Sequence, residues 1–204
     1  MKLTYTAPMH GRHATVRKAY NRNVQAGIID FVYCVTDRAD LDFLDQFPRT
    51  TVVESCQNNV NEKAQMAIAP PHSADAVILM GSDDYIDHAA YLMIERLLKD
   101  HDYIAFDDCY FHSGGQIWRW PGYPEKHPRH GEPAGAGKVI RMDLLNRMDG
   151  RVWMDYYAST DFSAHNRISQ YAKSPARINC KRDGVQLVDI KDGDSLTPLS
   201  NLNI

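Results

Sequence analysis

The sequence predicts a single-domain α/β fold, with a mostly parallel sheet flanked by helices. Apolar, strand-like runs alternate with segments of helical periodicity through about residue 100, the pattern of a parallel sheet with helical crossovers. The length of 204 residues suits one domain with a full core. Polar residues follow several of the apolar runs, as expected where parallel strands end at a ligand cleft. We expect one domain over residues 1–191 and a loosely ordered tail over residues 192–204.

Strands are expected at short apolar, β-prone runs that are bounded by turn residues. Pro8 and Gly11 stop the first run, and the second, a strongly apolar one, ends at Thr36 and Asp37. In chain order, the expected strands are residues 3–7, 28–35, 50–55, 76–80, 103–106 and 185–190.

Helices are expected where apolar residues recur every three or four positions. Gly27 closes the first of them in the usual C-terminal way, and Asp87 begins one with a clean apolar face. In chain order, the expected helices are residues 12–26, 39–47, 61–69, 87–98 and 161–171, and residues 138–148 predict a strand leading into a short helix. Between residues 114 and 137 glycine, proline and aromatic residues predict a long irregular loop.

Composition excludes several classes of protein. The net charge of −3 leaves no overall basic surface for nucleic acid, and no run approaches the 18 apolar residues of a membrane span. No apolar leader opens the chain, so we expect a cytoplasmic protein. The four cysteines form no C-x-x-C pair and are expected to be buried free thiols. Neither G-x-G-x-x-G nor G-x-x-x-x-G-K-[ST] occurs, which disfavours Rossmann dehydrogenases and P-loop enzymes.

Two adjacent carboxylates, Asp83 and Asp84, follow the apolar run 76–80. Neighbouring carboxylates repel each other, and a hard divalent cation such as Mg²⁺ or Mn²⁺ offsets that repulsion with oxygen ligands. A cation held in this way usually also holds the phosphates of a nucleotide substrate. The alternative is an acidic turn in which Asp84 or Asp87 caps the next helix.

Several motifs of the sequence follow one another in a set order. A Pro-containing turn, Thr6-Ala-Pro-Met-His-Gly-Arg12, follows the first strand, and Asp37 follows the second. The turn Asn58-Asn-Val-Asn-Glu-Lys-Ala64 precedes a helix, Ser82-Asp83-Asp84 follows a buried strand, and Asp161 opens a downstream helix. This order resembles that of family 2-like glycosyltransferases of the GT-A fold, in which a D-x-D motif stands where this chain has Ser82-Asp83-Asp84, with serine in the first position. The resemblance covers roughly residues 3–170, and the late Val-Asp-Ile-Lys191 segment resembles small phage-encoded members.

The resemblance implies an inverting hexosyl- or pentosyltransferase that uses Mn²⁺ or Mg²⁺ and a nucleoside-diphosphate sugar, with a UDP-sugar favoured. It implies that Asp84, helped by Asp83, holds the metal and that Asp161 is the catalytic base. Asp37 would meet the nucleobase, and Arg12 and Lys63 the diphosphate. The expected donor-binding residues are Pro8, His10, Arg12, Asp37, Lys63 and Asp83. The alternatives are a helix cap for Asp161, a turn residue for Asp37 and solvated surface charges for Arg12 and Lys63.

Further candidates come from the residues themselves. His165, four residues after Asp161 on the same helix face, is either a metal ligand or proton relay, or a core histidine. Asp107 and Asp108, after a strand expected beside residues 76–80, could bind sugar hydroxyls or cap a turn. Trp118 and Trp120 could stack on an acceptor, or be buried structural tryptophans.

The acceptor is the most open part of the prediction. Residues 117–151 carry seven Lys or Arg and four acids, a local charge of +3. With the aromatic residues this suggests a hydroxymethylated base in DNA as one acceptor, taken out of the stack for modification, and a saccharide as the other. A nucleotidyltransferase and a non-catalytic sugar- or nucleotide-binding module are the competing functions.

Overall fold

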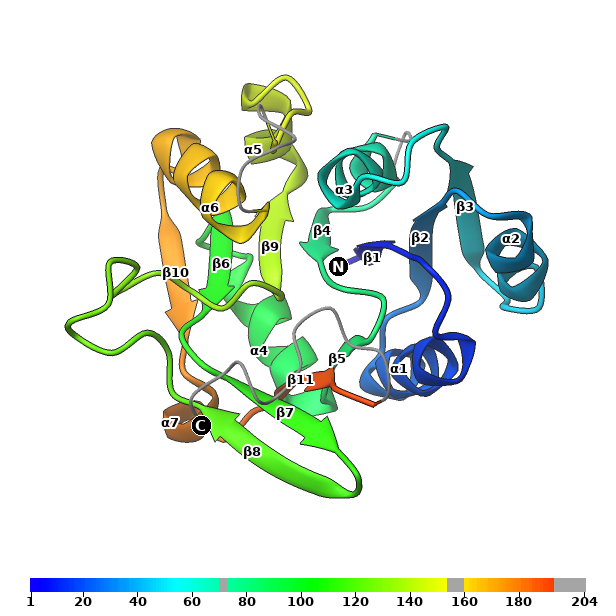
Figure 1. The fold of residues 1–204 in the computed structure, drawn as a ribbon. Helices are drawn as coiled ribbons and strands as arrows, with labels where there is room; N and C mark the ends of the chain where they lie inside the picture. Colours follow the sequence, from blue (N-terminus) through cyan, green and yellow to red (C-terminus); the bar gives the residue numbers. More distant parts are fainter. Residues whose placement is uncertain (70–72, 154–159, 193–204) are drawn as a thin grey trace.

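Two β-sheets and the helices around them organise the chain (Figure 1). The computed structural model describes residues 1–69, 73–153 and 160–192. Within these residues the prediction of an α/β fold is confirmed. No helix in the described part of the chain is long and apolar enough to cross a membrane.

The larger sheet has seven strands in the order β10-β6-β9-β4-β1-β2-β3. Among its described strands only β9 runs antiparallel to its neighbours, β4 and β6. The carboxyl ends of the other six therefore lie along one edge. In chain order the strands are β1 (Leu3–Pro8), β2 (Asp30–Val35), β3 (Thr50–Glu54), β4 (Ala76–Leu79), β6 (Tyr103–Phe106), β9 (Lys138–Arg141) and β10 (Pro175–Ile178).

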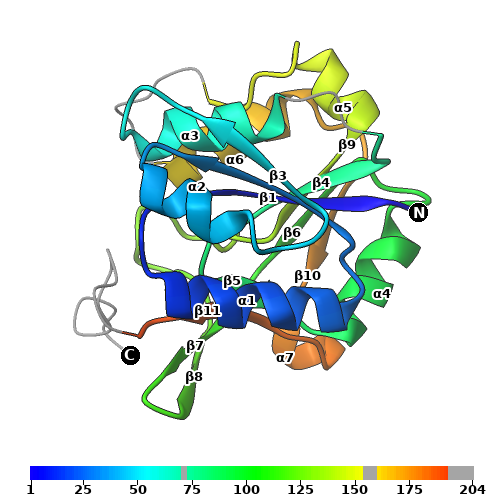
Figure 2. The same cartoon turned by 90° about the vertical axis from the view of Figure 1, so that its right-hand side faces the viewer.

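A smaller sheet with the order β5-β11-β7-β8 lies beneath this edge, and the β7–β8 hairpin projects from the body of the protein (Figure 2). The strand β11 pairs antiparallel with β5 and parallel with β7. The four strands are β5 (Asp84–Ile86), β7 (Cys109–Ser113), β8 (Gln116–Trp120) and β11 (Leu187–Ile190). This sheet brings the last described strand next to the residues that follow β4.

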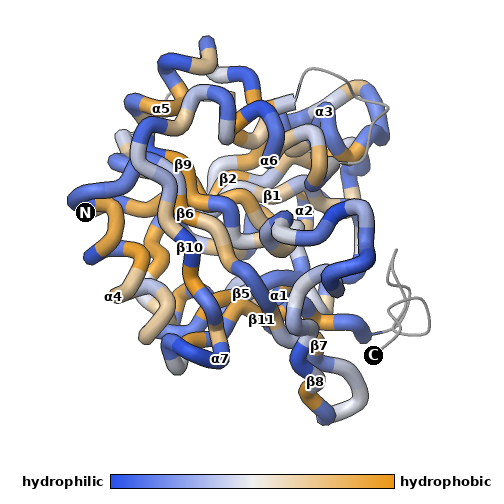
Figure 3. Tube along the Cα trace, turned by 90° about the vertical axis from the view of Figure 1, so that its left-hand side faces the viewer, coloured by the Kyte–Doolittle hydropathy of each residue, from blue (hydrophilic) through white to orange (hydrophobic). Residues whose placement is uncertain are grey.

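Helices cover both faces of the large sheet, and Figure 3 shows the apolar strands between them. Alternate residues of one strand serve different faces: Ile78 packs on the side of α1 and α4, whereas Val77 packs on the side of α3, α5 and α6. The helices are α1 (His13–Ala26), α2 (Arg38–Leu44), α3 (Val60–Ile68), α4 (His88–Leu97), α5 (Met142–Arg147), α6 (Thr160–Tyr171) and α7 (Cys180–Asp183).

Local sequence signals place several of these boundaries. Gly27 takes the left-handed conformation at φ 116° and donates its N–H to the carbonyls of Asn23 and Val24 at the end of α1. The side chain of Asp87 accepts from the N–H of Ala90 and caps α4. Both boundaries are as the sequence predicts.

Other elements correct the expectation from sequence. The expected irregular loop at residues 114–137 contains β8, which pairs with β7 across a turn at Gly114 and Gly115. Cross-strand pairing, and not local periodicity, forms this hairpin, because five residue pairs match along it. The strand β9 also lies between β4 and β6, so Asp107 and Asp108 do not end a strand adjacent to β4. Cys34, Cys109 and Cys180 are buried as expected, whereas Cys56 is exposed. Of the tail predicted over residues 192–204, all but Asp192 lies outside the described residues.

Candidate active site

The residues after β4 form a tight turn that brings the carboxylates of Asp83 and Asp84 close together. The two carboxylates pack closely on Gly81, since a methyl group on it would lie 2.8 Å from Asp83 Oδ1 and 2.8 Å from Asp84 Oδ2 and would displace them. The Gly81 N–H donates to Asp84 Oδ2, and the Tyr5 hydroxyl donates to the Gly81 carbonyl. The Asn23 amide donates to the Asp84 carbonyl at 2.9 Å. Contacts from β1 and α1 therefore hold this turn in place.

A third carboxylate, from Asp189 on β11, completes a cluster with Asp83 and Asp84. One oxygen from each of the three lies within 4.8 Å of the other two. Asp189 is directly opposite Asp84 in the antiparallel pairing of β11 with β5. Asp189 Oδ1 is buried and has no hydrogen-bond partner among the described residues. We name these three residues the carboxylate cluster.

The carboxylate cluster holds more negative charge than its surroundings offset. Burial, followed by the charge of Asp83, raises the pKa of Asp189 to about 6. Burial, followed by the charges of Asp189 and Asp83, raises the pKa of Asp84 well above its ordinary value. A donor set of three carboxylates, one with an unpartnered buried oxygen, fits a hard divalent cation such as Mg²⁺ or Mn²⁺.

Two basic side chains contact the carboxylate cluster. Arg12 NH1 lies 2.5 Å from Asp83 Oδ2, and Lys191 Nζ lies 2.6 Å from Asp189 Oδ2. Arg12 reaches this position from a left-handed backbone conformation with φ 55°, and its other terminal nitrogen donates to the carbonyls of Ile190 and Asp192. Arg12 therefore links the turn after β1 to the end of β11.

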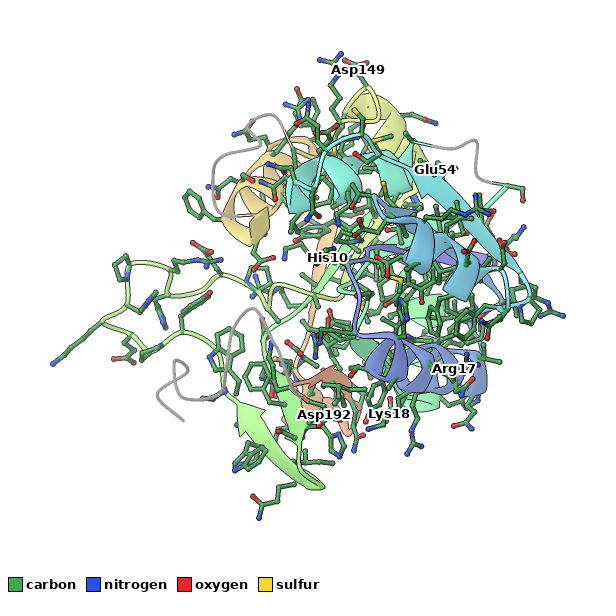
Figure 4. The ribbon with its side chains drawn as sticks, turned by 45° about the vertical axis from the view of Figure 1, so that its right-hand side comes forward. His10, Arg17, Lys18, Glu54, Asp149 and Asp192 are labelled. Atoms are coloured by element: carbon green, nitrogen blue, oxygen red, sulfur yellow. The ribbon has the colours of Figure 1, made fainter. Side chains whose placement is uncertain are left out.

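An ion pair also links the segment after β11 to α1. Lys18 Nζ of that helix lies 2.9 Å from Asp192 Oδ2, and Figure 4 shows the two side chains next to each other. Burial alone would lower the pKa of Lys191, but Asp189 outweighs burial and raises it, so this lysine stays charged beside the carboxylate cluster. The chain thus supplies two positive charges against three negative ones here.

A second polar group lies where β1 and β2 end. His10 Nδ1 is 3.1 Å from Asp37 Oδ2, and both side chains are more than half exposed. Asp37 immediately precedes α2, and among the described residues its side chain makes no capping hydrogen bond to that helix. The buried Asp40 accepts from the Gly11 N–H and lies 2.8 Å from His13 Nε2. Asp40 therefore holds the turn that presents His10.

Lys63 lies beneath that turn and not on its surface. Its side chain is 1 % exposed, and Nζ donates to the Met9 carbonyl at 2.7 Å and to Asn58 Oδ1 at 2.9 Å. Burial lowers the pKa of Lys63. A lysine bound in this way supports the turn after β1, and it is not the solvated surface charge that was the alternative. Pro8 ends β1 and lies opposite Cys34 in the register with β2.

Asp161 and His165 both lie on α6, but their side chains contact different parts of the structure. Asp161, in the first turn of that helix, lies against the backbone of Gly135. His165 Nδ1 lies 3.1 Å from the Tyr103 hydroxyl. Burial, followed by the charge of Lys138, lowers the pKa of His165 to about 4, so the ring is neutral near pH 7. Among the described residues, His165 is not one of the groups that gather with Asp83 and Asp84.

Asp107 and Asp108 have structural partners that correct the expectation of a sugar site. Asp108 is fully buried and accepts from the Cys180 N–H and from Arg119 Nε at 2.7 Å. Asp107 accepts from Arg177 Nε at 2.7 Å. These carboxylates join β7, β8 and α7 to the end of β6.

The aromatic residues after β8 largely contact one another. Trp120 meets Tyr123 edge to face at 5.0 Å between ring centroids, and Tyr123 stacks on His127 at 4.6 Å. The guanidinium of Arg129 lies 4.6 Å from the Tyr123 centroid. Trp118, on β8, is half-buried. Trp120 also packs against the main core, which leaves Trp118 the better placed of the two for an external ligand.

Asp189 and Asp40 are the site residues that sequence reasoning missed. Asp189 interrupts an apolar run, Leu187-Val188-Asp-Ile190, and a carboxylate in a buried strand needs a partner. That signal was available, but its link to Asp83 and Asp84, 105 residues earlier, depends on the pairing of β5 with β11.

Comparison with known proteins identifies the fold. No protein-family profile and no curated protein sequence matches this chain. Among solved structures, S. aureus TarS 1-349 in complex with UDP-GlcNAc matches with TM-score 0.70 and 13% identity, over 96% of this chain and 60% of that one. The mannosyltransferase PcManGT from Pyrobaculum calidifontis, in complex with GDP-Man and Mn²⁺, matches with TM-score 0.65 and 12% identity, over 98% and 58%.

A third matching structure is not named as a glycosyltransferase. The 4-diphosphocytidyl-2C-methyl-D-erythritol synthase from Anaerococcus prevotii matches with TM-score 0.60 and 7% identity, over 87% of this chain and 86% of that one. This chain spans about three fifths of the length of the glycosyltransferase chains above. At these identities the matches show the GT-A fold, and the reaction has to be argued from the site.

Proposed function

We propose that this chain is a metal-dependent glycosyltransferase that moves a sugar from a nucleoside-diphosphate sugar to a hydroxyl acceptor. The observation that carries the proposal is the carboxylate cluster, with its unpartnered oxygen on Asp189, at the carboxyl end of β4. In open α/β sheets this edge is where ligands bind. The solved structures of similar fold that hold UDP-GlcNAc, or GDP-Man with Mn²⁺, support the proposal.

Asp83, Asp84 and Asp189 would hold the cation. A bound Mn²⁺ or Mg²⁺ would neutralise charge on the diphosphate leaving group. Arg12 contacts Asp83 in this structure, and its guanidinium is close enough to share that work at the diphosphate. The Arg12 contacts to the carbonyls of Ile190 and Asp192 keep the end of β11 beside the cluster.

The nucleobase would lie at the end of β2. Asp37 and His10 are exposed there, and a carboxylate accepts the imino proton of a uracil ring. We therefore propose a UDP-sugar as the donor. Asp161 would act as the base that takes the proton from the acceptor hydroxyl during an inverting displacement.

For the acceptor we propose a saccharide hydroxyl ahead of a hydroxymethylated DNA base. The arginines at 119, 129, 141 and 147 pair with carboxylates of the chain, and Lys138 is buried. Five of the seven basic residues between 117 and 151 are thus engaged within the protein. Few charges are left there for DNA phosphates, which supply most of the affinity in DNA binding.

The decisive experiment measures metal-dependent donor binding. Thermal unfolding with UDP, GDP, CDP and ADP, with and without Mn²⁺, should show stabilisation that requires both UDP and the metal. Asp84→Asn keeps an acceptor for the Gly81 N–H but removes the charge, and should abolish the metal-dependent part. Asp87→Asn, which keeps the cap of α4 outside the cluster, is the matched control and should behave as the wild type. Equal stabilisation of the Asp84 variant would overturn the metal assignment.

A nucleotidyltransferase is the second candidate, and the match to the diphosphocytidyl synthase over most of both chains favours it. Such an enzyme would take a nucleoside triphosphate and release pyrophosphate. Incubation with each NTP and Mn²⁺, followed by a pyrophosphate assay, distinguishes the two. Pyrophosphate release without UDP release from UDP-sugars would favour the second candidate.

A further inference from the structure

Residues 134–138 form a strap that joins the ends of β6 and β4. The Ala134 N–H donates to the Phe106 carbonyl at 2.7 Å, and the Gly137 N–H donates to the Leu79 carbonyl at 2.8 Å. Gly137 has φ +79°, and a methyl group on it would lie 2.8 Å from the Phe106 ring. The path of the strap is therefore determined by backbone hydrogen bonds and close packing.

The carboxylate of Asp161 rests directly on this strap. A methyl group on Gly135 would lie 2.5 Å from Asp161 Oδ2 and 2.7 Å from Cγ. Atoms do not approach that closely without displacement of one of them. Only glycine at position 135 therefore lets the Asp161 carboxylate keep its place.

A buried lysine holds the same part of the strap. Lys138 is 1 % exposed, and its Nζ donates to the Ala134 carbonyl at 2.9 Å and to the Gly135 carbonyl. Burial lowers the pKa of Lys138, and Asp161 is the strongest of the charges that raise it. A buried ammonium without a contacting carboxylate is costly, and an apolar residue would fill this space at lower cost. The presence of a buried lysine at position 138 therefore indicates a functional role.

Among the described residues, other charged groups near Asp161 are balanced in pairs. Arg129 Nε lies 2.7 Å from Glu132 Oε2, and Arg177 Nε lies 2.7 Å from Asp107 Oδ1. On α6, His165 is neutral near pH 7, and the phenol of Tyr123 is uncharged, with a pKa that burial raises. In the described part of the chain, Lys138 on β9 has backbone carbonyls and no carboxylate as its contacts.

We propose that Lys138 is a positioning residue for Asp161: it holds the Gly135 backbone on which the Asp161 carboxylate rests. This inference rests on the proposed function, in which Asp161 is the base. A base has to keep its place beside the acceptor hydroxyl in order to take the proton.

The test measures the Asp161 carboxyl directly. In ¹³C-carboxyl NMR of the full chain at neutral pH, assigned with Asp161→Asn, Lys138→Met should move the Asp161 signal away from its wild-type chemical shift, because the strap loses the buried donor that holds the Ala134 and Gly135 carbonyls. Lys138→Arg, which retains a donor, should leave the signal near its wild-type position. Lys63→Met is the matched control, since Lys63 is also 1 % exposed and also binds a backbone carbonyl. It should lose stability without moving the Asp161 signal.

Activity provides the second readout. In Lys138→Met, kcat for Mn²⁺-dependent UDP-GlcNAc hydrolysis should fall at least about 10-fold with little change in donor KM, and Lys138→Arg should retain most of the wild-type kcat. If Lys138→Met fails to fold, Gly135→Ala tests the same contact, and should lower kcat at least about 10-fold with little change in donor KM. An unchanged Asp161 signal in folded Lys138→Met, or full kcat in Gly135→Ala, overturns the inference. A moved signal in Lys138→Met together with full turnover in Asp161→Asn would instead overturn the base assignment in the proposed function.

Discussion

Asp189→Asn should make the metal-free protein more stable and the metal-bound protein less so. The pKa of Asp189 rises from its ordinary value of 3.8 to about 6, first through burial and then through the charge of Asp83. At 1.36 kcal/mol per pKa unit, this corresponds to a penalty of up to about 3 kcal/mol for the ionised form. Asparagine removes the charge and keeps an oxygen for Lys191 Nζ.

The sign of the pH dependence follows from proton binding. The folded state holds the Asp189 proton more tightly than the unfolded state, so wild-type stability falls as pH rises from about 4 to about 6, and the penalty is complete above the folded pKa. Asp189→Asn should therefore gain up to about 3 kcal/mol at pH 7.5 in EDTA, or about 6–12 °C in Tm for a chain of this size. The gain should vanish at pH 4.

Metal binding should reverse the order of stability of the wild type and Asp189→Asn. Mn²⁺ at 100 times its Kd should stabilise the wild type by about 2.7 kcal/mol, and Asp189→Asn should lose most of this. Asp143→Asn is the control, because Arg141 holds the pKa of that exposed carboxyl at about 2, so its loss should destabilise slightly and leave the metal response unchanged. A lower Tm for Asp189→Asn in EDTA at pH 7.5, or an undiminished response to Mn²⁺, would refute the reasoning.

Three further outcomes are expected. Asp161→Asn should lower turnover by about 10²–10⁴, measured by steady-state kinetics, and should leave the donor Kd, measured by calorimetry, nearly unchanged. Full activity together with a loss of about 1 kcal/mol in the free energy of unfolding would show that Asp161 only caps α6. Asp102→Asn should cost about 2–4 kcal/mol in urea unfolding at pH 7, because the buried carboxylate accepts from the N–H groups of Lys173 and Ser174 and from Arg147. Burial alone would raise the pKa of Asp102, but these bonds outweigh it and lower the pKa, so the difference should shrink as pH falls below about 4; an equal loss at pH 3 would contradict this account. Hydroxymethylated DNA offered with a panel of nucleoside-diphosphate sugars should gain no sugar mass, and a mass gain on digested nucleosides would restore DNA as the acceptor.

Local signals were sufficient for the fold class and for one half of the carboxylate cluster. Apolar strand runs, the helix stop at Gly27 and the cap at Asp87 are short-range features, and each has its predicted place in the structure. Asp83 and Asp84 follow a buried strand in the sequence itself, so their position at its carboxyl end needs no long-range information.

Pairing between distant segments decided the rest. Asp189 joins the carboxylate cluster only because β11 pairs with β5. Asp108 is not available as a sugar ligand only because Arg119 and Cys180, from other elements, donate hydrogen bonds to its carboxylate. The burial of Lys138 and Lys63 likewise depends on segments that close over them. The sequence by itself determines which residues carry charge and how each strand and helix begins and ends. The tertiary structure determines which charges meet, since electrostatic interaction depends on distance and burial, and neither follows from position along the chain.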